Sequence, residues 1–158
     1  MKERRKLMGL AIAVTLAAAG SVGAQAPNKA LVVAKEPPLT QQRYEDRKKR
    51  IEAQSRADRK ACRRLEGDRR DVCEAQARGK EDAAKAKLEA RFRGTPEAVL
   101  QAKEVTARAN YEVAREKCAL LEGKTEDRCM DEAKAAREAA LRQARVEKVE
   151  STGGIYGR

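Results

Sequence analysis

The chain contains no histidine and no tryptophan, and its other aromatic residues are one phenylalanine and three tyrosines. The lack of histidine removes a common metal ligand and a common general base. The scarcity of large apolar side chains excludes a broad globular core, so stability must come from helix propensity, surface ion pairs, narrow alanine seams and cross-links. The sequence is instead rich in Ala, Glu, Lys, Arg and Gln, a composition typical of long helices.

The N-terminus has the pattern of a bacterial signal peptide. A basic segment over residues 2–6 precedes an apolar stretch over residues 7–19, which is shorter than the roughly twenty residues that span a bilayer. Val22 and Ala24 suit a peptidase site, so we expect cleavage after Ala24, with Ala26 as second choice and a short uncleaved anchor as the alternative. We therefore predict export to the periplasm without a stable transmembrane anchor, in a compartment that permits disulfides.

Residues that carry catalysis are scarce after this segment. Ser55 and Ser151 are the only serines there, and the carboxylates are scattered. A nucleophile needs a neighbouring base and an orienting partner, and no such set is visible. The adjacent acids Glu81 and Asp82 are interpreted as solvated helix surface. We predict a protein that is not an enzyme, uses no cofactor and holds no metal.

Glycine and proline divide the remaining chain into helices. Thr40 is a predicted N-cap, and Gly67 and Gly123 are predicted helix ends. The run Gly94-Thr95-Pro96 combines a stop with a new start. The predicted helices cover 41–66, 69–93, 96–122 and 126–149. The predicted organisation is a signal peptide (1–24), a flexible leader (25–40), two helical hairpin repeats (41–94 and 95–149) and a disordered tail (150–158).

The two hairpins are related by an internal duplication. Six residues of the first recur in the second at a constant offset of 56: Cys62, Leu65, Glu66, Gly67, Asp71 and Cys73 become Cys118, Leu121, Glu122, Gly123, Asp127 and Cys129. Each unit is a helix, a glycine bend and a helix. The predicted fold class is all-α: two tandem disulfide-linked hairpins of four helices, elongated. Phe92 and Tyr111 are interpreted as an anchoring contact between the hairpins, and Gly79 as a weak point of its helix.

The cysteines are predicted to form two disulfides: Cys62 with Cys73, and Cys118 with Cys129. A glycine bend between the two members of each pair allows their Cα atoms to approach the roughly 5.5 Å that a disulfide needs. If the helices instead ran unbroken through the glycines, Cys62 would pair with Cys129 and Cys73 with Cys118. We favour pairing within each repeat, because the glycines stand where a bend belongs. A redox-active or metal site would need a Cys-x-x-Cys or a histidine, and the sequence has neither.

The first predicted helix is the basic part of the chain. Residues 41–66 hold ten basic and five acidic residues, whereas 96–149 hold eleven of each. Such a helix can attract anionic phospholipid or lipopolysaccharide phosphates, although its charges also suit a solvated face without a ligand. The lack of interleaved aromatic residues argues against nucleic acid. The candidate anion-binding residues are Lys48, Lys49, Arg50, Arg59, Lys60, Arg63 and Arg64.

Three segments carry a family resemblance. Residues 91–96 (RFRGTP), 110–118 (NYEVAREKC) and 129–135 (CMDEAKA) resemble a group of small proteobacterial exported proteins labelled TolA-like cell envelope biogenesis proteins. The resemblance covers roughly residues 57–145 and both cysteine pairs, and it implies a helical envelope protein. Members usually have Gly-Asn-Ala-Lys-Asp at the bend, and this chain keeps the glycine and the final acid but not the interior residues, which suits a surface turn.

Together these patterns predict a non-enzymatic periplasmic protein, acting as an interaction module or spacer in cell envelope maintenance. Its expected partner is an envelope protein or an anionic lipid or lipopolysaccharide surface. A second hypothesis is a periplasmic stress protein or chaperone that binds unfolded clients or anionic lipid through the basic first helix. A third, a thiol oxidoreductase, requires an exposed cysteine of low pKa.

Overall fold

A computed structural model describes residues 38–154, which form four α-helices and no strand. The helices are α1 (Gln41–Cys62), α2 (Gly67–Arg93), α3 (Pro96–Cys118) and α4 (Lys124–Ser151). Helices α1 and α2 form one hairpin and α3 and α4 the other, each closed by a disulfide, so the predicted fold class is confirmed. The predicted signal peptide, the leader up to residue 37 and the tail beyond residue 154 lie outside the described residues.

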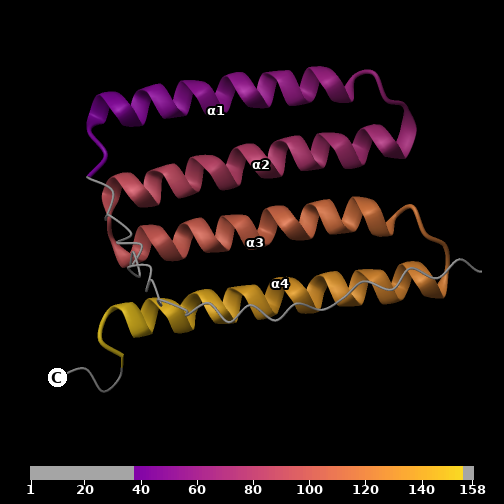
Figure 1. The fold of residues 1–158 in the computed structure, drawn as a ribbon. Coiled ribbons are helices and arrows are strands. Elements are labelled where there is room, and N and C mark those ends of the chain that lie inside the picture. The colour runs from indigo at the N-terminus through magenta and orange to yellow at the C-terminus, as the bar shows by residue number, and fades with distance from the viewer. Residues whose placement is uncertain (1–37, 155–158) are drawn as a thin grey trace, which may run out of the picture. The chain divides into compact units, whose positions relative to one another are not determined.

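The four helices lie side by side in a single layer, in chain order and with alternating direction (Figure 1). Each packs only on its neighbours in the chain: α1 on α2, α2 on α3 and α3 on α4, with no other helix pair in contact within residues 38–154. Helices α1 and α4 are therefore edges, and the layer presents two broad faces. Most buried apolar residues are alanines, because only small side chains fit the seams between adjacent helices.

Local capping signals position three of the helix ends. The Thr40 hydroxyl accepts a hydrogen bond from the amide of Arg43 at 3.4 Å, and Thr95 accepts one from the amide of Ala98 at 3.2 Å. Gly94 ends α2 with a φ of 68°, a left-handed conformation that costs glycine little. The stop and start predicted between the two hairpins therefore lie where the sequence places them.

In each cysteine bend, the sequence predicts that the glycine ends the first helix. In the structure the glycine stands at the start of the second helix instead. Helices α1 and α3 end at Cys62 and Cys118, and the residues that follow each cysteine form a turn. Gly67 and Gly123 have the predicted positive φ, 51° and 56°, but they stand at the start of the next helix. The first helix of each hairpin is shorter than predicted because the amide three residues after each cysteine bonds to the cysteine carbonyl at 2.9 Å, which tightens the turn.

The disulfides join Cys62 to Cys73 and Cys118 to Cys129, the pairing expected within each repeat. The Cα atoms are 5.5 Å apart in both pairs. Cys62 and Cys118 are each 1% exposed. No cysteine is free within residues 38–154, and the alternative pairing between repeats does not occur. Each hairpin is thus cross-linked next to its turn.

A seam of small side chains joins the two hairpins. Its buried cluster comprises Ala90, Ala98 and Ala102, and the partly buried Ala86 packs against it. Farther along the seam, a Cβ atom added to Gly79 would meet the Ala109 Cβ atom at 3.3 Å and the Ala109 carbonyl oxygen at 3.5 Å. Gly79 is therefore more than a weak point of its helix, because it lets α2 approach α3 closely.

The aromatic contacts lie within the hairpins, so the prediction that Phe92 and Tyr111 anchor one hairpin to the other is wrong. The Phe92 ring packs on Tyr44 of α1 with a centroid distance of 4.6 Å. Tyr111 is covered by the guanidinium of Arg137 on α4, 4.4 Å from the ring centroid. The α2–α3 seam is closed by small residues at short range, which leaves no room there for a ring.

Substituting Gly79→Leu should lower the free energy of unfolding by about 1–2 kcal/mol. Overpacking costs about 1–3 kcal/mol, which exceeds the gain in helix propensity of somewhat under 1 kcal/mol. The matched control is Ala135→Leu, at the equivalent position of the second hairpin on the exposed side of the edge helix α4, where we expect almost no loss. Urea unfolding measures both. Equal effects in the two variants would contradict the close approach.

Candidate functional site

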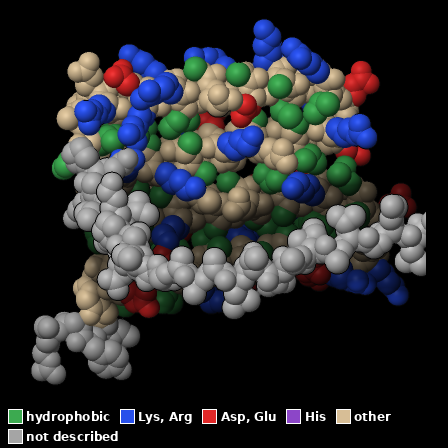
Figure 2. Space-filling view, in the orientation of Figure 1, with side chains coloured by type: hydrophobic (Ala, Val, Ile, Leu, Met, Phe, Trp, Pro, Cys, Tyr) green, Lys and Arg blue, Asp and Glu red, His purple; other side chains and the backbone are tan. Residues whose placement is uncertain are grey.

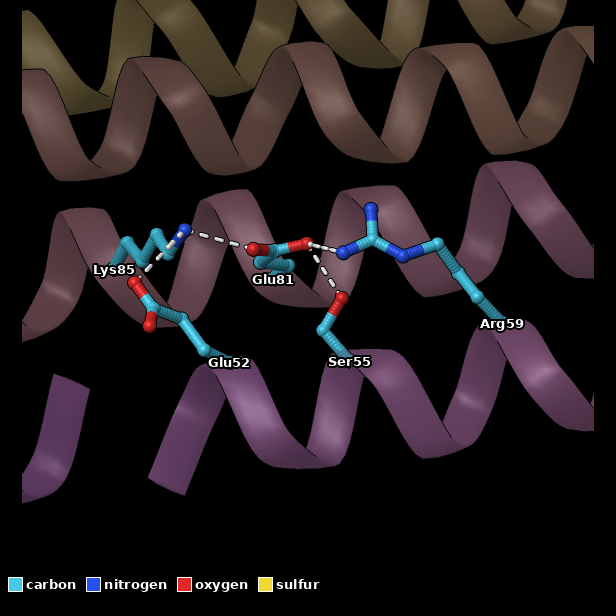
Figure 3. A network of polar contacts seen from close by, with 5 residues as sticks. All are labelled: Glu52, Ser55, Arg59, Glu81 and Lys85. Carbon is cyan, nitrogen blue, oxygen red and sulfur yellow. Dashed lines mark hydrogen bonds and ion pairs between the residues drawn. The ribbon is translucent and has the colours of Figure 1, made fainter. Parts of the chain in front are cut away.

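A network of polar side chains centred on Glu81 joins α1 to α2 (Figure 3). The Ser55 hydroxyl donates to the Glu81 carboxylate at 2.5 Å, Lys85 Nζ lies 2.7 Å from it and Arg59 lies 2.9 Å from it. Lys85 also reaches Glu52 at 3.7 Å. Ser55 is buried and the Glu81 side chain is only 11% exposed. The interpretation of this acid as solvated helix surface is therefore wrong.

The electrostatics of this network favour a clamp over a catalyst. Hydrogen bonds from Lys85 and then Ser55 hold the pKa of Glu81 below its ordinary value, and the bond to Glu81 raises the pKa of Lys85. A carboxylate surrounded by donors is a weak base and is poorly suited to take a proton from Ser55. A second such contact lies near the open end of the hairpin, where the Tyr44 hydroxyl donates to Glu89 at 2.7 Å and lowers the pKa of that acid.

The second hairpin keeps this position but changes its chemistry. At the offset of 56, Ser55 corresponds to Tyr111 and Glu81 to Arg137. Those two residues also meet across their hairpin, as a cation over an aromatic ring. The contact is thus a repeated means of holding two helices together.

The predicted anion-binding residues are divided among several surfaces. Arg59 belongs to the Glu81 network, and Lys48 lines a groove on the same side of the layer as Lys85 and Glu89. Arg50 lines a groove on the opposite side. The remaining four are exposed along α1 or in the turn that follows it: Lys49, Lys60, Arg63 and Arg64.

One side of the layer gathers lysines and arginines from α1, α2 and α3 (Figure 2). Three grooves on this side form one surface, since Lys87 lines all of them. We call this surface the basic face. Glu147 is the only acid that lines these grooves in the described part of the chain. The seven basic residues that line them are Arg47, Arg50, Lys80, Lys87, Arg91, Lys103 and Lys117.

A groove on the opposite side of the layer is balanced in charge. Successive residues of an α-helix are rotated by about 100°, so Lys85 and Lys87 point to opposite sides of α2. The groove on the Lys85 side is lined by three basic residues and three acidic ones: Lys48, Lys85 and Arg108 with Asp82, Glu89 and Glu112. The grooves on the two sides of the layer therefore differ in charge.

The densest positive charge of the basic face lies between α1 and α2. A groove of about 510 Å³ there is lined by four cations, Arg47, Arg50, Lys87 and Arg91, and by three apolar residues, Ile51, Ala84 and Leu88. We call it the basic groove. Within residues 38–154, Arg47, Arg50 and Lys87 form no salt bridge. Neighbouring cations of the same helix pair are engaged, as Arg59 is with Glu81 and Lys80 with Asp58.

Sequence reasoning found Arg50 and missed the other three cations of the basic groove. Lys87 and Arg91 are spaced by four residues, and Arg47 precedes Arg50 by three, which places each pair on one side of its helix. That spacing was the available signal. It indicates a ligand only once the register of α1 against α2 is known.

Comparison of the chain with protein-family models, curated proteins and solved structures finds no match in any of the three. None of the helices in residues 38–154 combines the length and the apolar character that a membrane crossing requires. The same residues hold no group of three or more cysteine and acidic side chains placed to bind a metal ion.

Acid should weaken the clamp between α1 and α2. The pKa of Glu81 is lower in the folded chain than its ordinary value of 4.5, so the stabilisation is complete above that pH and is lost as the pH falls below it. Glu81→Gln should cost about 1–2 kcal/mol at pH 7, as expected for hydrogen bonds to a charged group. The difference from the native protein should shrink between about pH 5 and pH 3 in urea unfolding.

The control for this substitution is Glu138→Gln. Glu138 pairs with Arg142 at 4.0 Å on the exposed surface of α4, and such pairs contribute little. We expect this variant to match the native protein at every pH. A loss for Glu81→Gln that stays constant with pH would contradict the role of the ionised carboxylate.

Proposed function

We propose that the protein is an exported, non-catalytic interaction module of the cell envelope, which docks on an anionic lipid surface through its basic face. The observation that supports this proposal is the unequal charge of the two faces. Seven cations and one acid line the grooves of the basic face, whereas three of each sign line the groove on the other side.

The single layer suits contact with a lipid surface. Lysine and arginine side chains have long stems, so cations from three adjacent helices can reach one plane together. Each cation near an anionic membrane contributes about 1 kcal/mol of attraction, which falls off within a Debye length. The balanced face would remain in water. A globular domain of the same size would divide these charges over a curved surface.

Compartment and resemblance support the same proposal. The N-terminal pattern predicts export, and the two disulfides are compatible with an oxidising, exported location. The resemblance to TolA-like proteins implies a role in the envelope, where anionic phospholipid and lipopolysaccharide are abundant.

A chaperone for unfolded clients is the second candidate, because a groove of about 570 Å³ between α3 and α4 has a partly apolar lining that includes Val99, Ala102 and Ala140. Val99 is 44% exposed. A chaperone of this kind would suppress aggregation of an unfolded test protein without any need for anionic lipid. A spacer would do neither.

The protein should bind vesicles of phosphatidylglycerol and not vesicles of phosphatidylcholine, and the binding should disappear between about 0.05 and 0.5 M NaCl as the charges are screened. Lys117→Glu on the basic face should weaken binding about tenfold, since it removes one attractive charge and adds one repulsive charge. Co-sedimentation measures both effects.

Arg108→Glu is the matched control. Arg108 and Lys117 lie on the same helix and are both exposed, but they are nine residues apart and so point to opposite faces. We expect Arg108→Glu to bind nearly as well as the native protein. Equal losses for the two variants, or equal binding to both kinds of vesicle, would refute docking through the basic face.

A further inference from the structure

We infer that the basic groove is a discrete site for one anionic amphiphile, with a phosphate group held by Arg47, Arg50 and Lys87 and an apolar part lying on Ile51 and Leu88. This inference rests on the proposed function in that it names the class of lipid recognised. It stands on separate observations, namely the lining of this one groove and the comparison with its duplicate.

The cations of the groove converge from two helices. Arg47 and Arg50 are one turn apart on α1, and Lys87 and Arg91 are one turn apart on α2, so the antiparallel packing turns two pairs of positive charges toward each other. No acid lines the groove within residues 38–154. Like charges at this density repel one another, and a bound anion would remove the repulsion. Arginine can bind phosphate with two parallel hydrogen bonds, so a phosphate group matches this arrangement of donors.

The floor of the groove is apolar. Leu88 is 7% exposed, and Ile51 and Ala84 are partly buried beside it. A volume of about 510 Å³ exceeds what inorganic phosphate needs and falls in the ordinary range of small-molecule sites. A ligand with both a phosphate and an apolar segment would occupy the cations and the floor together, whereas a free phosphate ion would leave the floor exposed to water.

The second hairpin contains the same groove with different chemistry. All seven lining residues of the basic groove have counterparts at the offset of 56, and all seven counterparts line one groove between α3 and α4: Lys103, Thr106, Ala107, Ala140, Gln143, Ala144 and Glu147. The four cations of the first hairpin correspond there to Lys103, Thr106, Gln143 and Glu147. Lys103 and Glu147 form a salt bridge with each other.

The duplication therefore separates the shape of the groove from its charge. The shape comes from the packing of any two helices in this register, since both hairpins have it. The charge and the larger floor residues belong to the first hairpin alone, where Ile51 and Leu88 stand in place of Ala107 and Ala144. A groove that served only to pack helices would not need Arg47, Arg50 and Lys87, which form no salt bridge within residues 38–154.

The test is a calorimetric titration of the purified protein with dihexanoyl phosphatidic acid, at lipid concentrations below those at which it forms micelles. We expect saturable binding of one lipid per chain, with inorganic phosphate at least tenfold weaker and dihexanoyl phosphatidylcholine not bound. The double variant Arg50→Thr/Lys87→Gln, which carries the residues of the second hairpin, should bind at least tenfold more weakly. Those residues are already accommodated at equivalent positions, and circular dichroism would verify the fold.

The matched control is Lys80→Gln/Lys117→Gln, which removes the same charge from the basic face outside this groove. It should retain binding of the soluble lipid while weakening binding to vesicles. If the soluble lipid does not bind, or binds equally to the two double variants, the basic groove is not a lipid site. Either outcome would leave docking on vesicles intact. Inorganic phosphate binding as tightly as the lipid would overturn the amphiphile and identify a free-phosphate site. Soluble-lipid binding without vesicle binding would support the groove and refute the docking.

Discussion

The disulfide of each hairpin fixes the register of its two helices, and every contact between those helices depends on that register. With the Cα atoms of Cys62 and Cys73 held 5.5 Å apart, antiparallel helices bring Ser55 opposite Glu81 and Tyr44 opposite Phe92. A slip of one residue would rotate the facing side chains by about 100° and separate both pairs. The second hairpin has the same cross-link and register, so its different residues meet at equivalent positions.

The small size of the buried side chains explains why charge dominates the surface. Alanine and glycine seams hold adjacent helices together but provide too little apolar area to attract a second layer. Each helix is therefore left with two solvent-facing sides, and the inner helices α2 and α3 display charge on both faces of the layer. The same scarcity of large apolar residues that prevents a closed core thus creates the two faces whose charges differ.

The sequence predicts the hairpins well because their signals are local. The cap at Thr95, the stop at Gly94 and the spacing of the cysteines act within a few residues, and each lies where expected. The sequence places the ends of the first and third helices about one helical turn beyond Cys62 and Cys118, where they end in the structure. The roles of Glu81 and Phe92 are not predicted, because they depend on which side of a helix meets its neighbour. The candidate site was only partly predicted, since adjacent basic residues point in different directions around a helix. Combining the cysteine register with helical spacing would have placed Arg47 and Arg50 beside Lys87 and Arg91 in one groove.

The order of contacts along the chain bears on how the polypeptide assembles. A polypeptide is synthesised from its N-terminus, and here no helix in residues 38–154 needs a partner that lies more than one element ahead. The first hairpin can therefore close before α3 and α4 have emerged. Both disulfides join cysteines that are consecutive in the sequence, so oxidation in order of emergence yields the native pairs directly.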